Sequence, residues 1–374
     1  MTKRIPLYEV HKDLGALFGE FAGWEAPINY GSVIEEHMAV RSSVGIFDLS
    51  HMGRILVSGA DSIRLLDYLV PRELGVDVGE MAGPTAFLNE RAGFKDDVML
   101  YRLSSDQWLI VCNAINIEKV LNWLEYWSAK LSLSVRVEDK TMDSVLIAIQ
   151  GPDSLKALKM LKPRPDPSSL KLLKFVRDVY LEELDCKMCL ISRSGWTGED
   201  GFEIIGPLDC GEKILRYLHD KGVRLCGLAA RDSLRMEMGY VLYGHEINED
   251  ITPIDARYWW VLQPGPKKGG FIGYEALMEA FKRGARMVRV GIKMAKRVRI
   301  VPRSGDKILV LDEQVGYITS GAFSPVLKRS IAQAYVKPSH ALIGLRVVVE
   351  HRGKCYEGKI VEFPFVTPSS KPPV

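Results

Sequence analysis

Two stretches of the chain share one order of hydrophobic and polar positions. Residues 55–69 (ILVSGADSIRLLDYL) and 147–161 (IAIQGPDSLKALKML) each begin with an apolar run, continue with a glycine and end with leucines at helical spacing. This order predicts a strand, a tight turn and a helix in each stretch. Gly59 and Gly151 supply the backbone freedom that the two turns need.

The elements expected after each stretch also match. After the first come the strand-like runs VMLYRL and WLIVCN and the amphipathic run IEKVLNWLEYW; after the second come CKMCLISR, FEIIG and CGEKILRYL. Asp61 and Asp153 stand where the N-caps of the two helices are expected. We therefore predict an internal duplication near residues 55–127 and 147–218, whose strands pair in one mostly antiparallel, ferredoxin-like sheet.

The texture changes near residue 280. Short alternating strands follow, separated by Gly, Pro, Asp and Ser turns, which is typical of a small β-barrel or sandwich. We predict two regions, residues 1–280 and a C-terminal barrel domain over residues 281–374, and an α+β fold class. The final FVTPSSKPPV is rich in Pro and Ser and is expected to fray.

Composition narrows the class of protein. The 374 residues are 47% hydrophobic and 26% charged, which suits a soluble protein of several lobes. The formal net charge of +3 is too small for nucleic-acid binding by the whole surface, so nucleic acid is not an expected partner. No apolar run is long enough to span a membrane, and the N-terminus has no signal or transit pattern. We expect a cytoplasmic location and no membrane partner.

One basic stretch is hidden by this average. Residues 282–307 hold ten Lys and Arg against a single acid. Strand alternation in RMVRVGIKM predicts that Arg289 and Lys293 lie on the polar face of a barrel strand. Such a face can meet nucleic acid, an acidic partner protein or a polyanionic ligand tail, or it can simply be solvated.

The cysteines indicate a reducing compartment. Six cysteines with uneven spacing do not suggest a disulfide framework. Cys186 and Cys189 form a CxxC, but no second CxxC or histidine pair accompanies them, so we expect no metal site. The alternating run CKMCLISR favours two half-buried strand cysteines.

Motifs of the common enzyme classes are absent from the sequence: it contains no P-loop, no GxGxxG that opens a helix, no HExxH and no GxSxG. Asp96 and Asp97 precede a strand, where neighbouring side chains point to opposite faces, so only one of them can face a given pocket. A carboxylate at the mouth of a strand can orient or accept a proton. The alternative is a solvated turn carboxylate.

Further along the chain, Glu203 follows the glycine-rich run SRSGWTGEDGFEI. An inward-facing carboxylate there needs a donor, and Arg231, near a predicted helix start, can provide one. The alternative for Arg231 is a surface arginine. His51 in DLSHMG is interpreted as a hydrogen-bonded structural residue.

Several of these segments together resemble one family. FAGWEAPINYGSVIEEHMAVRSSVGIFDLSHMG, LNERAGFKDDVMLYR, SRSGWTGEDGFEI and GLAARDSLRMEMGYVLYGHEI occur in the order and spacing of the aminomethyltransferases, or T-proteins, of the glycine cleavage system. The resemblance extends from the first residues to about residue 366. It implies a three-lobed folate-binding fold with the barrel as third lobe, and two interleaved lobes before it.

The resemblance also implies an activity. The family transfers a one-carbon unit from the aminomethyl-lipoyl arm of the H-protein to tetrahydrofolate, which yields 5,10-methylenetetrahydrofolate, ammonia and the dihydrolipoyl arm. Tetrahydrofolate is the acceptor substrate, and lipoylated H-protein is the expected partner. We expect the basic stretch to dock an acidic H-protein surface or a polyglutamylated folate tail.

Site residues follow from the resemblance position by position. The essential acid of the family falls on Asp97. Its folate contacts fall on Met52, Val111, Asn113, Glu203 and Arg231. Trp196 stands where the family usually has tyrosine, so it keeps an aromatic wall without the hydroxyl. Lys95 replaces an apolar residue two positions before the acid, and we expect it to face solvent.

Two other functions are compatible with such a resemblance. One is a folate-dependent demethylase of a small methylated compound, and the other is a non-catalytic folate-binding or RNA-binding regulatory paralogue. The match of DLSHMG, TGEDG and AARDSLR, together with Asp97, favours the aminomethyltransferase.

Overall fold

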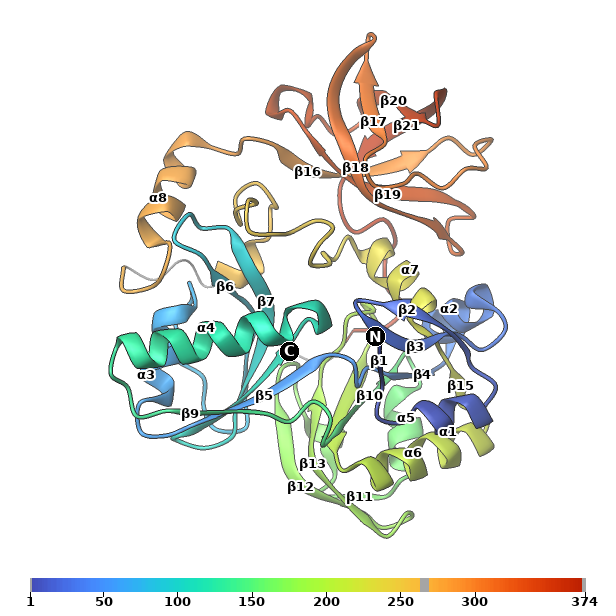
Figure 1. Cartoon of the computed structure of the whole chain (residues 1–374). Coiled ribbons are helices and arrows are strands. Elements are labelled where there is room, and N and C mark those ends of the chain that lie inside the picture. Colours follow the sequence, from blue (N-terminus) through green and yellow to red (C-terminus); the bar gives the residue numbers. More distant parts are fainter. Residues whose placement is uncertain (1, 263–268, 372–374) are drawn as a thin grey trace.

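Each copy of the duplicated pattern builds its own sheet (Figure 1). The computed structural model describes residues 2–262 and 269–371. The first sheet contains, in spatial order, β6 (Met81–Leu88), β7 (Phe94–Arg102), β8 (Gln107–Cys112), β5 (Gly53–Ser58) and β9 (Arg136–Asp139). The second contains β11 (Pro163–Arg164), β12 (Phe175–Leu181), β13 (Cys186–Arg193), β14 (Gly201–Gly206), β10 (Val145–Gln150), β4 (Gly45–Asp48) and β15 (Arg224–Leu225).

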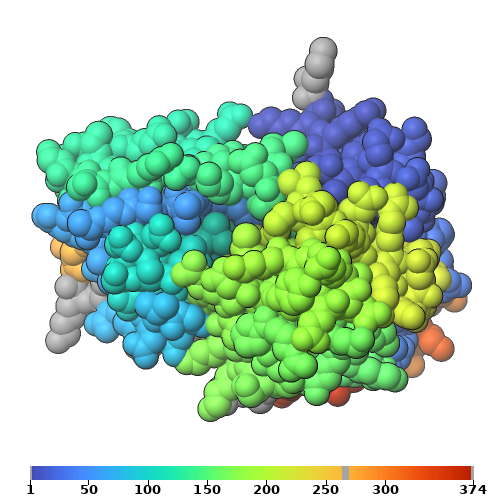
Figure 2. Space-filling view, turned by 90° about the horizontal axis from the view of Figure 1, so that it is seen from below, coloured from blue at the N-terminus to red at the C-terminus, as the bar shows by residue number. Residues whose placement is uncertain are grey.

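The predicted strand, helix, two strands and helix are present in both copies, but each copy has further strands before the predicted pair: β6 in the first copy, and β11 and β12 in the second. The single shared sheet is wrong. The helices of the first copy are α3 (Ser62–Leu69) and α4 (Ile117–Lys130), and those of the second are α5 (Ser154–Lys159) and α6 (Leu208–Asp220). The helices of the first copy share a core with their own sheet and with one face of the second sheet, whereas α5 and α6 pack in a separate core on the other face of the second sheet. Figure 2 shows the two lobes side by side.

The two lobes exchange one strand each. Strand β4 precedes the first copy in the chain but pairs with β10 of the second. Strand β9 precedes the second copy but pairs with β5 of the first. At the matching turns, a Cβ on Gly59 would lie 2.3 Å from the Ser134 carbonyl oxygen, and one on Gly151 would lie 2.4 Å from that of Ser43. Both glycines also have positive φ, so the turn admits no side chain.

The two aspartates expected as caps hold the exchanged strands instead. Asp61 and Asp153 occupy the N-cap positions of α3 and α5, yet neither side chain bonds to its helix. Asp61 Oδ2 accepts a hydrogen bond from Ser134 N at 2.9 Å. Asp153 Oδ2 accepts one from Ser43 Oγ at 3.0 Å. In each lobe the carboxylate therefore ties the turn to the segment that leads into the exchanged strand.

An N-terminal sheet and four further helices surround the lobes. The sheet has the order β1 (Lys3–Arg4), β3 (Trp24–Asn29) and β2 (Leu17–Phe21). The helices are α1 (Tyr8–Asp13), α2 (Val33–Ser42), α7 (Leu228–Met238) and α8 (Tyr274–Arg283). Short 3-10 turns occur at Ala114–Asn116, Pro167–Ser169, Trp259–Leu262 and Pro338–His340. Among the described residues, no helix is long and apolar enough to cross a membrane.

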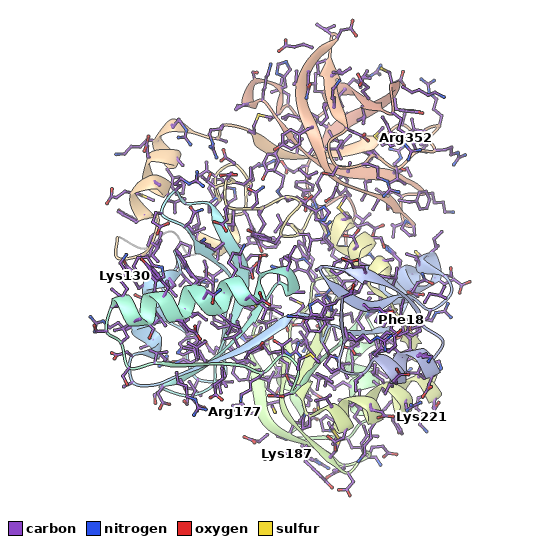
Figure 3. The ribbon with its side chains drawn as sticks, in the orientation of Figure 1. Phe18, Lys130, Arg177, Lys187, Lys221 and Arg352 are labelled. Atoms are coloured by element: carbon purple, nitrogen blue, oxygen red, sulfur yellow. A yellow bond between two sulfur atoms is a disulfide. The ribbon has the colours of Figure 1, made fainter. Side chains whose placement is uncertain are left out.

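The third lobe is a closed six-stranded barrel, as predicted. Its strands, in order around the barrel, are β16 (Val288–Met294), β19 (Arg329–Val336), β18 (Glu313–Ser324), β17 (Lys307–Val310), β20 (Arg346–His351) and β21 (Lys354–Val361). Alternate side chains such as Val290 and Ile292 fill the interior. The α+β class and the C-terminal barrel are thus confirmed. Lysines and arginines labelled in Figure 3, including Lys130 and Arg352, lie at the periphery of the lobes.

The placement of Arg289 on an exposed polar face is wrong. Its side chain is buried, and it donates hydrogen bonds to the carbonyl oxygens of Ala256 at 2.6 Å and Gly239 at 2.7 Å. The face of β16 that carries Arg289 packs on the segment between α7 and the barrel, which a strand pattern alone does not reveal. Lys293 is half-buried, and Arg297 is exposed and pairs with Glu357.

The cysteine prediction is wrong for one pair. Cys186 at the start of β13 forms a disulfide with Cys210 in α6, 24 residues later. Cys189, the other cysteine of the CxxC, is an exposed free thiol. The disulfide joins a strand to the helix that packs on it, and the spacing of CxxC is unrelated to this pairing.

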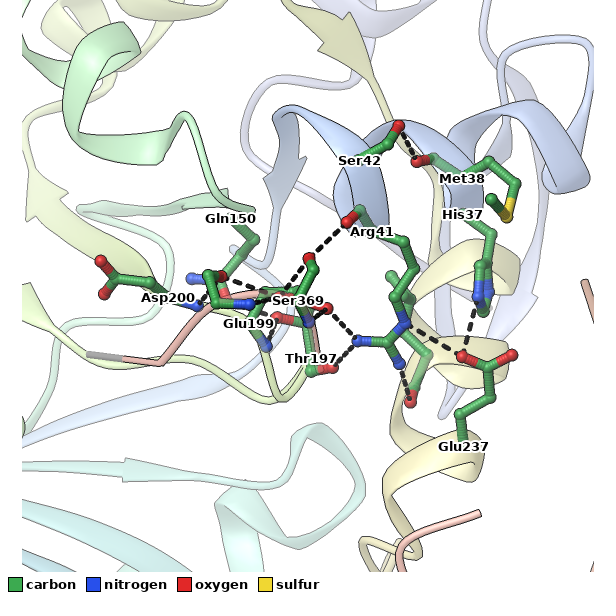
Figure 4. A network of polar contacts seen from close by, with 12 residues as sticks. His37, Met38, Arg41, Ser42, Gln150, Thr197, Glu199, Asp200, Glu237 and Ser369 are labelled. Atoms are coloured by element: carbon green, nitrogen blue, oxygen red, sulfur yellow. Dashed lines mark hydrogen bonds and ion pairs between the residues drawn. The ribbon is translucent and has the colours of Figure 1, made fainter. Parts of the chain in front are cut away.

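The C-terminal tail does not fray over residues 365–371 (Figure 4). Phe365 and Val366 are buried. The backbone N–H groups of Ser369 and Ser370 donate to the Glu199 carboxylate at 3.1 Å and 2.7 Å, and the Ser370 hydroxyl donates to it at 2.8 Å. The Ser369 hydroxyl lies 2.6 Å from the Arg41 carbonyl oxygen and 3.0 Å from the same carboxylate. The prediction of fraying is therefore wrong for this part, and residues 372–374 lie outside the described residues.

Glu199 belongs to a buried polar cluster of His37, Arg41, Glu199 and Glu237, here called the sealed network (Figure 4). Arg41 donates from Nη1 to Glu199 Oε1 and from Nε to Glu237 Oε2, both at 3.0 Å. His37 Nε2 lies 3.0 Å from Glu237 Oε2, and Ser324 Oγ donates to Glu237 Oε1 at 2.5 Å. The network thus joins α2, α7, the second lobe and the barrel.

Candidate active site

A cavity of about 480 Å³ lies where the two lobes meet the N-terminal sheet and α7. Its wall comes from β2, from the loops and strands of both lobes, from α7 and from residues 241–245. A volume of this size suits a small organic molecule. All the site residues expected from the sequence line it: Met52, Asp97, Val111, Asn113, Trp196, Glu203 and Arg231.

Asp97 lies on β7 with its carboxylate toward the cavity, whereas its neighbour Asp96 is fully buried behind the strand. Asn113 joins the two, because its side-chain amide donates to Oδ1 of Asp96 and to Oδ1 of Asp97, each at 2.8 Å. Tyr258 donates its hydroxyl to Asp97 Oδ2 at 3.2 Å. Burial raises the pKa of Asp97 above the usual carboxyl value, against the hydrogen bonds from Asn113 and Tyr258.

Asp96 orients the Asn113 side-chain amide, which donates a hydrogen bond to Asp97. Its carboxylate accepts hydrogen bonds from the backbone N–H of Asn113 at 3.0 Å and from the Asn116 side chain at 2.6 Å. Burial raises the pKa of Asp96, and the neighbouring charge of Asp97 raises it further. Two carboxyls held by one amide in a dry wall disfavour a second negative charge, so this wall readily holds a proton.

The wall formed by the second lobe and α7 has the opposite character. Glu203 on β14 accepts a hydrogen bond from Ser194 Oγ at 2.5 Å. Arg231, in the first turn of α7, lines the cavity, and its Nη1 is buried without a hydrogen-bond partner among the described residues. Burial lowers the pKa of Arg231, and the charge of Glu203 only partly opposes this. A donor and an acceptor are thus both available to a polar ring edge.

Apolar and aromatic groups separate these two polar walls. Val111 on β8 is buried, and Met52 is half-buried beside it in the cavity wall. Trp196 packs against Tyr240 with 4.6 Å between the ring centroids. Flat apolar surfaces with polar groups at both ends suit a planar heterocycle.

Lys95 does not face solvent as expected. Its ammonium lies 3.0 Å from Glu249 Oε2 and 4.7 Å from the ring centroid of Trp123, and its side chain is 19% exposed. It shares the strand face of Asp97 but does not line the cavity. Glu249, from a loop 154 residues later, neutralises its charge.

Three site residues were missed or misjudged from the sequence. Tyr258 lies in an irregular segment without a motif, so no signal pointed to it. Ser194 lies in the glycine-rich run, one residue after the end of β13, and the pattern SRS places it two positions after Ser192 of that strand. His51 was interpreted as hydrogen-bonded, but it lines the cavity and its Nδ1 has no partner among the described residues.

Known proteins match this chain over nearly its whole length. Residues 7–264 match the GCVT N-terminal domain, and residues 288–367 match the glycine cleavage T-protein C-terminal barrel domain. A probable aminomethyltransferase from Aeropyrum pernix is 41% identical over 99% of both chains. An aminomethyltransferase from Caldanaerobacter subterraneus is 37% identical over 96% of this chain and 95% of its own.

A solved structure agrees. The crystal structure of the glycine cleavage system aminomethyltransferase T from Bartonella henselae has a TM-score of 0.88 and 34% identity, over 98% of this chain and 99% of that chain. The three-lobed fold and the family resemblance of the sequence are thereby confirmed. Because both domains match the family models and the relatives match nearly the whole chain, the chain belongs to the aminomethyltransferase family of the glycine cleavage system, a family of transferases.

Proposed function

We propose that this protein transfers the one-carbon unit of an aminomethyl-lipoyl H-protein to tetrahydrofolate, and so forms 5,10-methylenetetrahydrofolate, ammonia and dihydrolipoyl H-protein. The observation that carries the proposal is the shared cavity. It places a carboxylate of raised pKa opposite a donor–acceptor pair, with apolar walls between them. A cytoplasmic location stays a prediction from the sequence.

The pteridine ring of tetrahydrofolate is proposed to lie against Met52, Val111 and Asn113. Glu203 then accepts hydrogen bonds from ring and amino N–H groups, because Ser194 occupies only one of its oxygens by a direct bond. Arg231 donates to the same ring edge through its unpaired Nη1. Trp196 covers the ring system from the side of the second lobe.

Asp97 is the proposed catalytic residue. Its carboxylate, held by Asn113 and Tyr258, orients the folate amine that attacks the iminium-like carbon and accepts the proton that this amine releases. A pKa raised toward neutrality suits a group that must take up and return a proton in one cycle. Asp96 is fully buried and Asp97 is half-buried in the cavity wall, so a ligand that covers Asp97 limits the access of water to that proton.

A reconstituted assay tests the function. Aminomethylated H-protein, tetrahydrofolate and this protein are mixed, and ammonia and 5,10-methylenetetrahydrofolate are measured. We expect both products only when all three components are present. Product formed from a small methylated compound without H-protein would instead identify a demethylase, and folate binding without any turnover would identify a regulatory paralogue.

A further inference from the structure

His51 lies in the loop where the chain crosses from one lobe to the other. Strand β4 of the second sheet ends at Asp48, and strand β5 of the first sheet begins at Gly53. His51 stands between them, is 4% exposed and lines the cavity. The ring of Phe21 contacts it edge-on, with 5.6 Å between the centroids.

Hydrogen bonds hold the backbone on both sides of His51. Ser50 N donates to Asp48 Oδ1 at 2.7 Å, and Met52 N donates to the Leu49 carbonyl oxygen at 2.9 Å. Arg54 donates to the Ser50 carbonyl oxygen at 3.0 Å and also to that of Met52. The loop that carries the imidazole is therefore rigid, and the ring is held at the cavity wall.

The imidazole itself has been left without a partner. Its Nδ1 is buried and makes no hydrogen bond within the described residues. The nearest carboxylate of its own loop, that of Asp48, is already engaged by His11 Nε2 at 2.7 Å and by Ser50. A buried polar atom without a partner is unfavourable and calls for an explanation. Because His51 lines the cavity, a bound ligand can provide a partner for the imidazole.

The charge state of His51 fits such a contact. Burial lowers the pKa of His51 to about 3, with the charges of Arg231 and Arg54 acting in the same direction against Asp48. At neutral pH the ring is therefore uncharged and offers one N–H donor and one lone pair. It complements Arg231, which only donates, and Glu203, which only accepts when ionised.

We propose that His51 is a ligand-binding residue of the cavity, whose neutral imidazole completes a hydrogen bond with a polar atom of the bound reduced pterin. The inference rests on the proposed function for the chemical class of the ligand. It adds a contact at the crossing loop to those of Glu203 and Arg231, and it ties pterin recognition to the segment that joins the two lobes.

Two substitutions test the contact. His51→Leu removes both ring nitrogens, and His51→Asn keeps a polar group near the position of Nδ1. Tetrahydrofolate affinity is measured by calorimetry, and stability without ligand is measured by denaturant unfolding. We expect His51→Leu to weaken binding about tenfold and to leave the unliganded protein as stable as before, because no hydrogen bond of the free protein is lost. His51→Asn should recover most of the affinity.

The matched control is His219→Leu, on an exposed histidine in the last turn of α6 outside the cavity, which should change neither quantity. Tetrahydrofolate affinity within twofold of wild type in His51→Leu would overturn the inference. So would a loss of stability in His51→Leu together with a failure of His51→Asn to restore binding, because that pattern indicates a structural role. If the wild-type protein binds no tetrahydrofolate, the proposed function fails first, and that result is distinguishable.

The pH dependence of binding provides a second readout. Because His51 stays uncharged over the accessible range, the share of the affinity that His51→Leu removes should be constant between pH 5.5 and 8. A share that disappears as the pH falls through about 6.5, the ordinary value for histidine, would show that the ring titrates and would contradict the assignment.

Discussion

Helix α7 carries a member of each of two buried polar clusters, and the clusters differ in one respect. Glu237 in its last turn belongs to the sealed network, in which each carboxylate and the Arg41 guanidinium have hydrogen-bond partners. Arg231 in its first turn belongs to the cavity wall, where Arg231 Nη1 and His51 Nδ1 have none among the described residues. Other buried polar atoms without a partner in the described chain lie away from the cavity, so the missing bonds of Arg231 and His51 point to a ligand only because both residues line the cavity.

The pKa values of Glu237 in the sealed network and of Asp97 in the cavity shift in opposite senses. Burial alone raises the pKa of Glu237, but the hydrogen bond from His37 and the charge of Arg41 bring it below its usual value. In the cavity burial dominates, so the pKa of Asp97 is raised and that of Arg231 is lowered. The surroundings of Glu237 therefore favour its ionised form, while the cavity disfavours the ionised forms of Asp97 and Arg231.

The sharpest test of this contrast is Asp97→Asn. Transfer from aminomethylated H-protein should fall by about 10²–10⁴-fold, the typical contribution of a positioned acid–base group, while tetrahydrofolate affinity changes only a few-fold. Stability should be maintained, since the amide removes a charge that burial disfavours. Steady-state kinetics and denaturant unfolding measure the two effects. Asp143→Asn, on an exposed aspartate, is the control. Undiminished turnover would remove Asp97 from the mechanism.

Glu237→Gln should show the reverse pattern. It leaves Arg41 and His37 buried beside a neutral amide, so we expect the free energy of unfolding to fall by about 3–5 kcal/mol. The folded fraction should bind tetrahydrofolate normally. The same substitution at Glu182, which pairs with Arg164 on the surface, should cost less than about 1 kcal/mol. Equal losses of unfolding free energy in the two variants would show that Glu237 contributes no more to stability than a surface carboxylate does.

Arg231→Met should uncouple ligand binding from stability. Without ligand, the variant should be at least as stable as wild type, because a desolvated guanidinium with an unpaired Nη1 is removed. Tetrahydrofolate affinity should fall by about tenfold or more, the loss expected for a hydrogen bond from a charged donor, and a thermal-shift titration reads both effects. Arg216→Met on the surface of α6 is the control. If the variant without ligand is less stable than wild type, Arg231 contributes to the stability of the fold, as the residues of the sealed network do, and the prediction is wrong.

The pH dependence of stability separates the clusters further. Because the pKa of Asp97 is raised in the folded protein, that protein holds a proton which the unfolded chain has released. The stability associated with this proton is present below about pH 4 and is lost as the pH rises through the raised value. Asp97→Asn should therefore gain stability relative to wild type between pH 4 and 7, by at most about 1.4 kcal/mol per pH unit. A pH-independent difference would contradict this assignment.

The smallest expected effect is at the tail that closes the sealed network. Ser370→Ala removes a hydroxyl that donates to Glu199, and Ser369→Ala removes one that lies 3.0 Å from the same carboxylate, but both keep the backbone donors. Each should lower the free energy of unfolding by about 1 kcal/mol and leave tetrahydrofolate affinity unchanged. Ser168→Ala, whose hydroxyl bonds only locally to Asp166, is the control. A clear loss of tetrahydrofolate affinity would show that the C-terminal tail contributes to ligand binding in the cavity.

Several features of the fold could be predicted because short-range physics decides them. The apolar periodicity and the turn glycines at 59 and 151 identified both copies, and strict alternation identified the barrel strands. The prediction of a single shared sheet was wrong, because the local sequence of a strand such as β4 does not determine that its pairing partner lies in the other copy. Arg289, Lys95 and Cys186 were misplaced for the same reason, since their partners lie far along the chain or in another element.

The sequence by itself determined which residue types are present for the chemistry: an acid at 97, an acid at 203 and an arginine at 231, each in a recognisable motif. Only the tertiary structure decided that they share one cavity, because the exchange of β4 and β9 draws the two lobes together there. The tertiary structure also decided which buried polar groups have hydrogen-bond partners and which have none. Whether a buried polar atom has a hydrogen-bond partner depends on segments that are distant in the chain. The tertiary structure therefore decides that Glu237 has partners and that His51 Nδ1 has none among the described residues.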